Sequence, residues 1–254
     1  MQLGAVTYNV LKDWDLDTII KNLEAAGFSA VELRTGHAHG VERSLDAAGR
    51  GRVKERFTRT KVRLLSLGSE CEFQSPDPAE RRKQVEAGKQ WVDLAHDVGA
   101  WGVKVRPNGL PKDVPKETTF QNIGGALREL GEYGRGYGVE IWLEVHGRDT
   151  QLPSSAAAIM KATGNENVGL CWNSNPTDVV DGSLKQSFNL LKKYLRNCHI
   201  HELSDNYPYR ELFALLQQNG YERYTLLEGQ ASKEPERYLR NYKALWTELS
   251  RKCS

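Results

Sequence analysis

Several features are scarce in this sequence of 254 residues. It has no apolar run near the length needed to cross a bilayer, and no charged segment followed by an apolar stretch of the secretory type. Its four cysteines, Cys71, Cys171, Cys198 and Cys253, are scattered and form no CxxC pair. We therefore expect neither a membrane span nor a disulfide framework, and we predict a reducing compartment, the cytoplasm.

An excess of charge of one sign is also lacking. The chain has 35 Lys and Arg against 33 Asp and Glu, a formal net charge of +2, with no block of basic residues. A protein that tracks a phosphate backbone needs such a basic stripe. Nucleic acid is therefore not a predicted partner.

What the sequence does contain is one pattern repeated eight times, a short β-rich run followed by an amphipathic run. Parallel strands joined by helical crossovers give this pattern. Strands are predicted over residues 3–7, 30–34, 62–67, 102–106, 139–144, 168–172, 197–201 and 224–228. Helices are predicted over residues 16–26, 79–98, 125–137, 184–194 and 234–250. Asp15 or Asp17 suits the start of the first helix, and Pro78 suits the first turn of another.

Eight such units predict one (β/α)8 TIM barrel that spans residues 1–254 as a single domain. The length is usual for one α/β barrel and sufficient for one large core. A doubly wound open sheet uses the same units, but no glycine-rich nucleotide turn follows the first strand. The glycine-rich segments 124–125 and 134–138 are interpreted as ordinary turns. Glycine also stands between a helix and the next strand at Gly27, Gly99 and Gly138.

Polar side chains gather at the C-terminal ends of the predicted strands, where barrels carry their catalytic groups. Of the six histidines, only His96 lies on a predicted helix. Four of these side chains, one at the end of each of strands five to eight, are two carboxylates, an imidazole and an amide. Their oxygen and nitrogen atoms suit Mn²⁺, Mg²⁺, Co²⁺ or Zn²⁺ as ligands, so we predict a divalent metal site. The alternative is that the two glutamates are buried charges paired with Lys104, Arg106 or Arg34. The four candidate ligands end strands five to eight and are Glu144, Asn173, His199 and Glu228.

Five short stretches carry a further signal: VELR at 31–34, LEVHG at 143–147, GLCWN at 169–173, NCHIHE at 197–202 and LLE at 226–228. In their order and strand positions they resemble the xylose isomerase-like barrel superfamily of sugar and sugar-phosphate isomerases and epimerases, over nearly the whole chain. In that family a Glu, an Asp, a His and a Glu from strands five to eight hold the metal. The resemblance thus implies the same four ligands, and it allows a homo-oligomer.

Asn173 departs from this family, which has Asp at that position, and Pro176 stands where a His often follows. Loss of one negative charge is expected to weaken metal binding. Asn173 either ligates through its side-chain oxygen, with Asn175 or Asp178 compensating, or belongs to a turn. The sequence leaves both interpretations open.

Two histidines compete for the ligand position on strand seven. His199 and His201 are two residues apart on a strand and so point to one face. The family pattern places the ligand at His199 and an acid at Glu202. An exchange of roles between the histidines, or a core role for His201, stays open.

The resemblance implies a metal-dependent sugar isomerase or epimerase that moves a proton through an enediolate. Glu144 and Glu228 would act as acid and base as well as ligands. Trp14 and Trp172 are expected to pack in the core. The loops after strands seven and eight lack the glycine pair of a barrel phosphate site, which favours an unphosphorylated substrate. Substrate-binding candidates, each with an ion-pair alternative, are His146, His201, Arg148, Arg34, His37, Glu70, Lys104 and Arg106.

Three other functions remain as alternatives. A lyase or dehydratase acting on a keto-sugar uses the same enediolate to expel a leaving group. A barrel that binds a sugar without turning it over is compatible with Asn173. The endonuclease branch of the superfamily, which cleaves DNA with three zinc ions, needs more His and Asp ligands than residues 204–207 supply, and a more basic chain.

Overall fold

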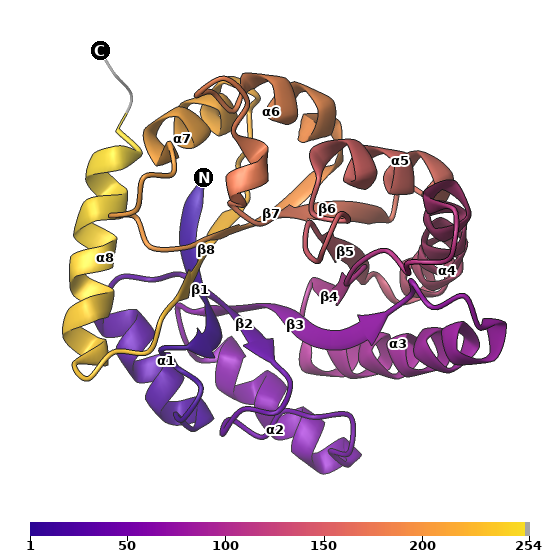
Figure 1. Ribbon diagram of the computed structural model, residues 1–254. Coiled ribbons are helices and arrows are strands. Elements are labelled where there is room, and N and C mark those ends of the chain that lie inside the picture. The colour runs from indigo at the N-terminus through magenta and orange to yellow at the C-terminus, as the bar shows by residue number, and fades with distance from the viewer. Residues whose placement is uncertain (252–254) are drawn as a thin grey trace.

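The chain forms a closed barrel of eight parallel strands ringed by helices, seen end-on in the computed structural model (Figure 1). The structure describes residues 1–251. Each strand pairs with the next and β8 pairs with β1, so the predicted (β/α)8 barrel is confirmed. The strands are β1 (Gln2–Asn9), β2 (Ala30–Arg34), β3 (Arg63–Glu72), β4 (Gly102–Arg106), β5 (Glu140–Glu144), β6 (Val168–Trp172), β7 (Leu195–Ile200) and β8 (Tyr224–Gly229).

Eight α-helices of the described residues cover the outside of this sheet. Asp15 caps the first helix by accepting a hydrogen bond from the Thr18 backbone N–H at 2.8 Å, and Pro78 opens the third, both as expected. The helices are α1 (Leu16–Ala25), α2 (Ala47–Thr58), α3 (Pro78–Val98), α4 (Lys116–Tyr137), α5 (Pro153–Thr163), α6 (Lys185–Leu191), α7 (Tyr209–Gln218) and α8 (Pro235–Leu249).

One predicted helix boundary was wrong. The helix expected over residues 125–137 begins at Lys116, and the glycines interpreted as turns lie inside it, up to the C-cap at Gly138. A Cβ on Gly124 would lie 2.7 Å from the Ala162 side chain of α5, and one on Gly134 would lie 2.5 Å from a backbone oxygen. These glycines therefore allow close packing of α4 rather than breaking it.

One layer of the barrel lumen, around Trp142, is apolar. Trp142 on β5 fills it and is fully buried, beside Val6, Leu65 and Leu226. Gly102 on β4 makes this possible, because a Cβ there would lie 2.7 Å from the indole. The polar groups above Trp142 thus lie next to a buried apolar layer that excludes water, where electrostatic interactions are strong.

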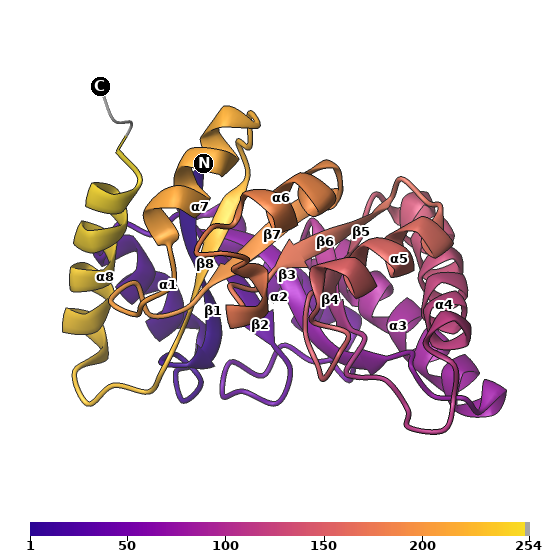
Figure 2. The ribbon, with the colours of Figure 1, turned by 45° about the horizontal axis from the view of Figure 1, so that its top comes forward.

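The two ends of the barrel differ in what they carry. In Figure 2 the N-terminus and the end of α8 lie at the top, and the loops that follow the strands project at the opposite end.

None of the helices within residues 1–251 is both long and apolar enough to cross a membrane. Trp172 belongs to the hydrophobic core and Trp14 is partly buried against it, as expected.

Candidate active site

A cavity of about 590 Å³ opens at the C-terminal ends of the strands. Its volume lies within the range of roughly 300–1,000 Å³ that is usual for small-molecule sites. Most of its lining side chains are charged or carry amides, which suits a hydroxylated ligand better than an apolar one. The lining residues are Tyr8, Arg34, Lys104, Arg106, Glu144, His146, Gln151, Asn173, Asn175, His201, Glu202, Asp205, Glu228 and Gln230.

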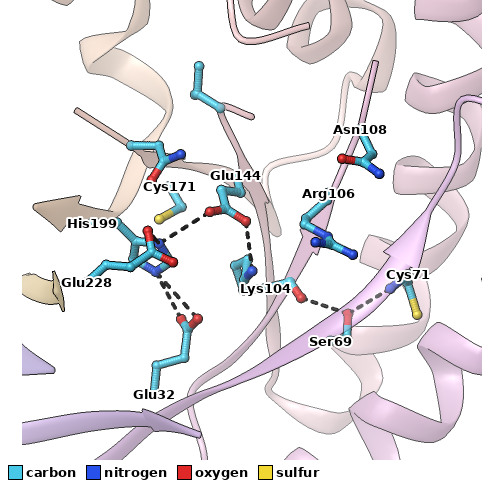
Figure 3. Close-up of polar contacts among 12 residues, drawn as sticks. Glu32, Ser69, Cys71, Lys104, Arg106, Asn108, Glu144, Cys171, His199 and Glu228 are labelled. Carbon is cyan, nitrogen blue, oxygen red and sulfur yellow. Dashed lines mark hydrogen bonds and ion pairs between the residues drawn. The ribbon is translucent and has the colours of Figure 1, made fainter. Parts of the chain in front are cut away.

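Three of the four predicted ligands meet beneath this cavity. Glu144, His199 and Glu228 each offer one ligand atom within 4.8 Å of the others. His199 Nδ1 lies 3.5 Å from Glu144 Oε1 and 3.5 Å from Glu228 Oε2 (Figure 3). This nitrogen is buried and has no hydrogen-bond partner in the described part of the chain. An unpartnered imidazole nitrogen between two carboxylates fits the donor set of a divalent cation.

The other ring nitrogen of His199 faces a third carboxylate. His199 Nε2 lies 3.4 Å from Glu32 Oε1, and both side chains are fully buried. Glu32 is held in turn by Ser66 Oγ, which donates to Oε2 at 2.7 Å, and by Asn197 Nδ2 at 3.4 Å. Burial acts to lower the pKa of His199, but the charges around it, Glu32 and Glu228 among them, raise the pKa well above its usual value. A cation therefore binds at Nδ1 by displacing a proton, while the carboxylate at Nε2 holds the orientation of the ring. Glu32 therefore directs Nδ1 toward the two ligand glutamates.

Glu32 was missed as a site residue, although a signal for it exists. It stands two residues before Arg34, which was expected at the barrel mouth, and side chains two apart on a strand share a face. The alternation of side chains along β2 therefore predicts that Glu32 points into the barrel lumen, one layer below the mouth. Its partner is not, since Glu32 and His199 are 167 positions apart in the sequence.

Changing Glu32 to glutamine is expected to weaken metal binding about 10- to 100-fold, because the amide holds the imidazole less firmly in the required tautomer. Titration of metal-free protein with Mn²⁺ against a chelator measures this. Glu55→Gln, on the exposed side of α2, serves as the control. An unchanged affinity in Glu32→Gln would show that Glu32 does not orient the ligand.

Glu144 is also one half of a buried ion pair. Lys104 Nζ donates to Glu144 Oε2 at 2.7 Å, and both side chains are at most 4% exposed. Burial raises the pKa of Glu144, but the Lys104 charge and the His199 contact outweigh it and lower the pKa to about 2. The ion-pair alternative thus holds for Oε2 of Glu144, while Oε1 stays directed at His199.

Glu228 is the more accessible of the two carboxylates, with 14% of its side chain exposed into the cavity. Burial acts to raise its pKa, but the charge and close contact of His199 and the contact with His201 lower the pKa well below its usual value. His201 Nε2 lies 3.4 Å from Glu228 Oε2 and 3.3 Å from Asn173 Oδ1. His199 therefore occupies the buried position, and His201 lies at the mouth.

The loop after β6 divides its polar residues between two roles. The Asn175 backbone N–H donates to Asp178 Oδ2 at 2.8 Å, and Asn175 Nδ2 donates to the Val145 carbonyl at 2.6 Å. Tyr207 also donates to Asp178. These contacts are those of a turn, whereas the Asn173 side chain faces His201 and the cavity.

Changing Asn173 to aspartate is expected to tighten Mn²⁺ binding by on the order of tenfold, because it adds a negative oxygen next to Glu228 and His201. Calorimetric titration of both proteins compares the dissociation constants. Equal or weaker binding by the variant would place residue 173 outside the ligand set.

The remaining substrate-binding candidates fall into two groups. His146, Arg34 and Arg106 line the cavity, together with Lys104 and His201. The structure does not bring the other three to the lining: His37 lies behind Arg34, while Glu70 and Arg148 are exposed outside it. The loop residues Gln151, Asp205 and Gln230 were missed, because loops lack the strand alternation that reveals an inward face.

Fold and site together define the class of protein: a (β/α)8 barrel with a Glu, His and Glu cluster at the C-terminal ends of its strands. The family model described as xylose isomerase-like TIM barrel matches residues 20–248. The chain therefore belongs to this family, which confirms the resemblance drawn from the sequence. Comparison with curated proteins gives no match.

Solved structures give the same fold at low sequence identity. The zinc-bound IolI protein matches with a TM-score of 0.79 and 16% identity, covering 98% of this chain and 96% of that one. D-psicose 3-epimerase with D-tagatose from Clostridium cellulolyticum H10 matches at 0.82 and 14%, covering 98% and 99%. The 3-keto-D-glucoside 4-epimerase YcjR from E. coli matches at 0.80 and 15%, covering 98% and 99%. At such identities the likeness establishes the fold, and function is argued from the site.

Proposed function

We propose that this protein is a metal-dependent sugar isomerase or epimerase. The observation that carries the proposal is the buried cluster of Glu144, His199 and Glu228 at the floor of a polar cavity. The solved barrels of similar fold include two sugar epimerases and a zinc-bound protein, which supports the same assignment. The substrate proposed is a ketose or a keto-glycoside.

A divalent ion, Mn²⁺, Mg²⁺, Co²⁺ or Zn²⁺, would be held by Glu144, His199 and Glu228, with the Asn173 amide oxygen beside them. When bound, it supplies a Lewis acid that polarises a carbonyl and its neighbouring hydroxyl. The mixed oxygen and nitrogen donors fit these ions, and the unpartnered Nδ1 of His199 supports the assignment.

Proton transfer is assigned to the two glutamates. Both are ionised at neutral pH in the metal-free protein, so either can accept a carbon-bound proton. They reach the substrate from β5 and β8, on two sides of His199. Return of the same proton to the neighbouring carbon completes an isomerisation. In an epimerisation one glutamate takes the proton from one face, and the other, which must first have taken up a proton from solvent, delivers it to the opposite face of the same carbon.

The test is hydrogen exchange in D₂O with Mn²⁺-loaded protein and a panel of D-fructose, D-tagatose, D-psicose, L-ribulose and a 3-keto-D-glucoside. We expect deuterium at the carbon next to the carbonyl, together with an isomeric product. Loss of water or of the aglycone instead would establish the lyase or dehydratase alternative. Binding without exchange would indicate a sugar-binding barrel.

The proposed partner is a small sugar, and the proposed location is the cytoplasm. Cys71, Cys171 and Cys198 are free and buried, which is compatible with a reducing compartment. Cys253 lies outside the described residues. The almost balanced charge of the chain, 35 Lys and Arg against 33 Asp and Glu, gives no support to DNA cleavage, which is not proposed.

A further inference from the structure

Arg34, at the end of β2, is held in the wall of the cavity by neutral groups. Its guanidinium lies over the Tyr8 ring, 5.2 Å from the ring centroid, and its Nη1 lies 3.5 Å from His37 Nε2. The ring of Tyr8 offers a cation–π contact, which leaves the edge of the guanidinium free to donate. The side chain is therefore positioned before any ligand arrives.

His37 contributes as a neutral acceptor. Burial, followed by the charge of Arg34, lowers the pKa of His37 to about 4. Because guanidinium only donates, Nε2 of His37 accepts and Nδ1 carries the proton, which it donates to Thr7 Oγ1 at 2.8 Å. Thr7 Oγ1 also accepts from the Arg34 backbone N–H at 3.0 Å. This arrangement fixes Arg34 without neutralising it.

The other cations that line the cavity are neutralised. Lys104 pairs with Glu144 at 2.7 Å, and Arg106 pairs with Glu72 at 2.9 Å. Arg34 forms no ion pair within residues 1–251. The positive charge of Arg34 is thus partly buried with no carboxylate to neutralise it. An anionic group of a bound ligand would supply the missing partner.

Arg34 lines the same cavity as Glu144 and Glu228 and lies nearer to its mouth than the buried Glu32. Glu32 lies two residues earlier on the same face of β2 and contacts His199. At about 3.3 Å per residue, Arg34 stands roughly 7 Å nearer to the solvent than Glu32. A molecule in this cavity whose carbonyl faces Glu144 and Glu228 can therefore extend toward Arg34.

We infer that the substrate carries an anionic group, a carboxylate or a phosphate, at the end remote from its carbonyl, and that Arg34 binds this group. The inference rests on the proposed function, which places the carbonyl over the cluster. Planar guanidinium matches both anions with paired hydrogen bonds. Arg34 is accordingly the residue that separates acidic from neutral sugars at this site.

The experiment compares three ligands that differ only at the sixth carbon: D-fructose, D-fructuronate and D-fructose 6-phosphate. Calorimetry with Mn²⁺-loaded protein measures each dissociation constant in wild type, Arg34→Gln and Arg34→Lys. The control is Arg63→Gln, because Arg63 begins β3 at the other end of the barrel and stacks on Trp101.

We expect wild type and Arg63→Gln to bind one anionic ketose about 10- to 100-fold more tightly than D-fructose. Arg34→Gln is expected to lose this preference and Arg34→Lys to retain part of it. The anion that binds more tightly identifies carboxylate or phosphate, and a preference for the phosphate would overturn the expectation of an unphosphorylated substrate drawn from the loops after β7 and β8. Equal binding of all three ligands, no binding of either anionic ketose, or a preference that survives in Arg34→Gln overturns the inference.

Failure of the inference and failure of the proposed function give different results. If Arg34 does not select an anion, metal-dependent hydrogen exchange with neutral ketoses persists in Arg34→Gln. If the proposed function is wrong, no ketose exchanges hydrogen in any variant, while an anion preference of wild type remains measurable by binding alone.

Discussion

Glu228→Gln is expected to lower the rate of substrate hydrogen exchange by about 10²- to 10⁴-fold. Glu228 is the more exposed of the two carboxylates that line the cavity, and it is ionised at neutral pH, so it can accept a proton. The amide keeps the shape and one ligand oxygen but accepts no proton. The rate is measured at saturating Mn²⁺, so that a weaker affinity for the ion does not enter the comparison.

Glu222→Gln is the matched control for this loss, because Glu222 is exposed just before β8, at the opposite end of the strand from Glu228. Exchange at the wild-type rate by Glu228→Gln, with the ion bound, would remove Glu228 from proton transfer. The hydrogen-exchange rate of Glu144→Gln, measured in the same way, would then show whether Glu144 accepts the proton.

Lys104→Met is expected to destabilise the metal-free protein by about 3–5 kcal/mol. The substitution leaves the Glu144 carboxylate buried, close to Glu228 and without its ion-pair partner. For a chain of this size each kcal/mol shifts Tm by roughly 2–4 °C, so the loss is large in a thermal scan. Urea unfolding in the presence of a chelator gives the free energy directly.

The effect depends on pH in a fixed direction. In wild type the folded-state pKa of Glu144, about 2, lies below the ordinary 4.5, so its contribution is present above pH 4.5 and is lost as the pH falls toward 2. The gap between wild type and Lys104→Met is therefore widest near neutral pH and narrows in acid. The double variant Lys104→Met with Glu144→Gln is expected to recover most of the stability, since no unpaired charge remains. Equal stability of Lys104→Met and wild type would contradict this account of the pair.

Much of the fold was readable from the sequence because parallel strands in a barrel are short buried runs at regular intervals. Strands β2, β4 and β6 lie where the pattern placed them. The start of α4 was not readable, because glycines that allow close approach to α5 look the same in a sequence as glycines that end a helix.

The ligand glutamates and His199 were predictable because strand ends converge in a barrel. The ion pairs inside the barrel were not predictable, because they depend on which residues of neighbouring strands lie opposite each other. The pairing between β3 and β4 shifts between Gly68 and Glu72, which sets Glu72 opposite Arg106 and extends β3 beyond the predicted residue 67. The same extension leaves Glu70 exposed rather than at the mouth. A bulge of this kind has no signature in a single sequence.

The central claim is that Glu144, His199 and Glu228 hold one divalent ion, and elemental analysis tests it most directly. Wild type, Glu228→Ala and the control Glu222→Ala are dialysed against a micromolar mixture of Mn²⁺, Co²⁺, Zn²⁺ and Mg²⁺ and then analysed. We predict close to one ion per chain in wild type and in Glu222→Ala, and loss of that ion in Glu228→Ala. Wild type free of metal, or an ion retained in full by Glu228→Ala, would contradict the claim.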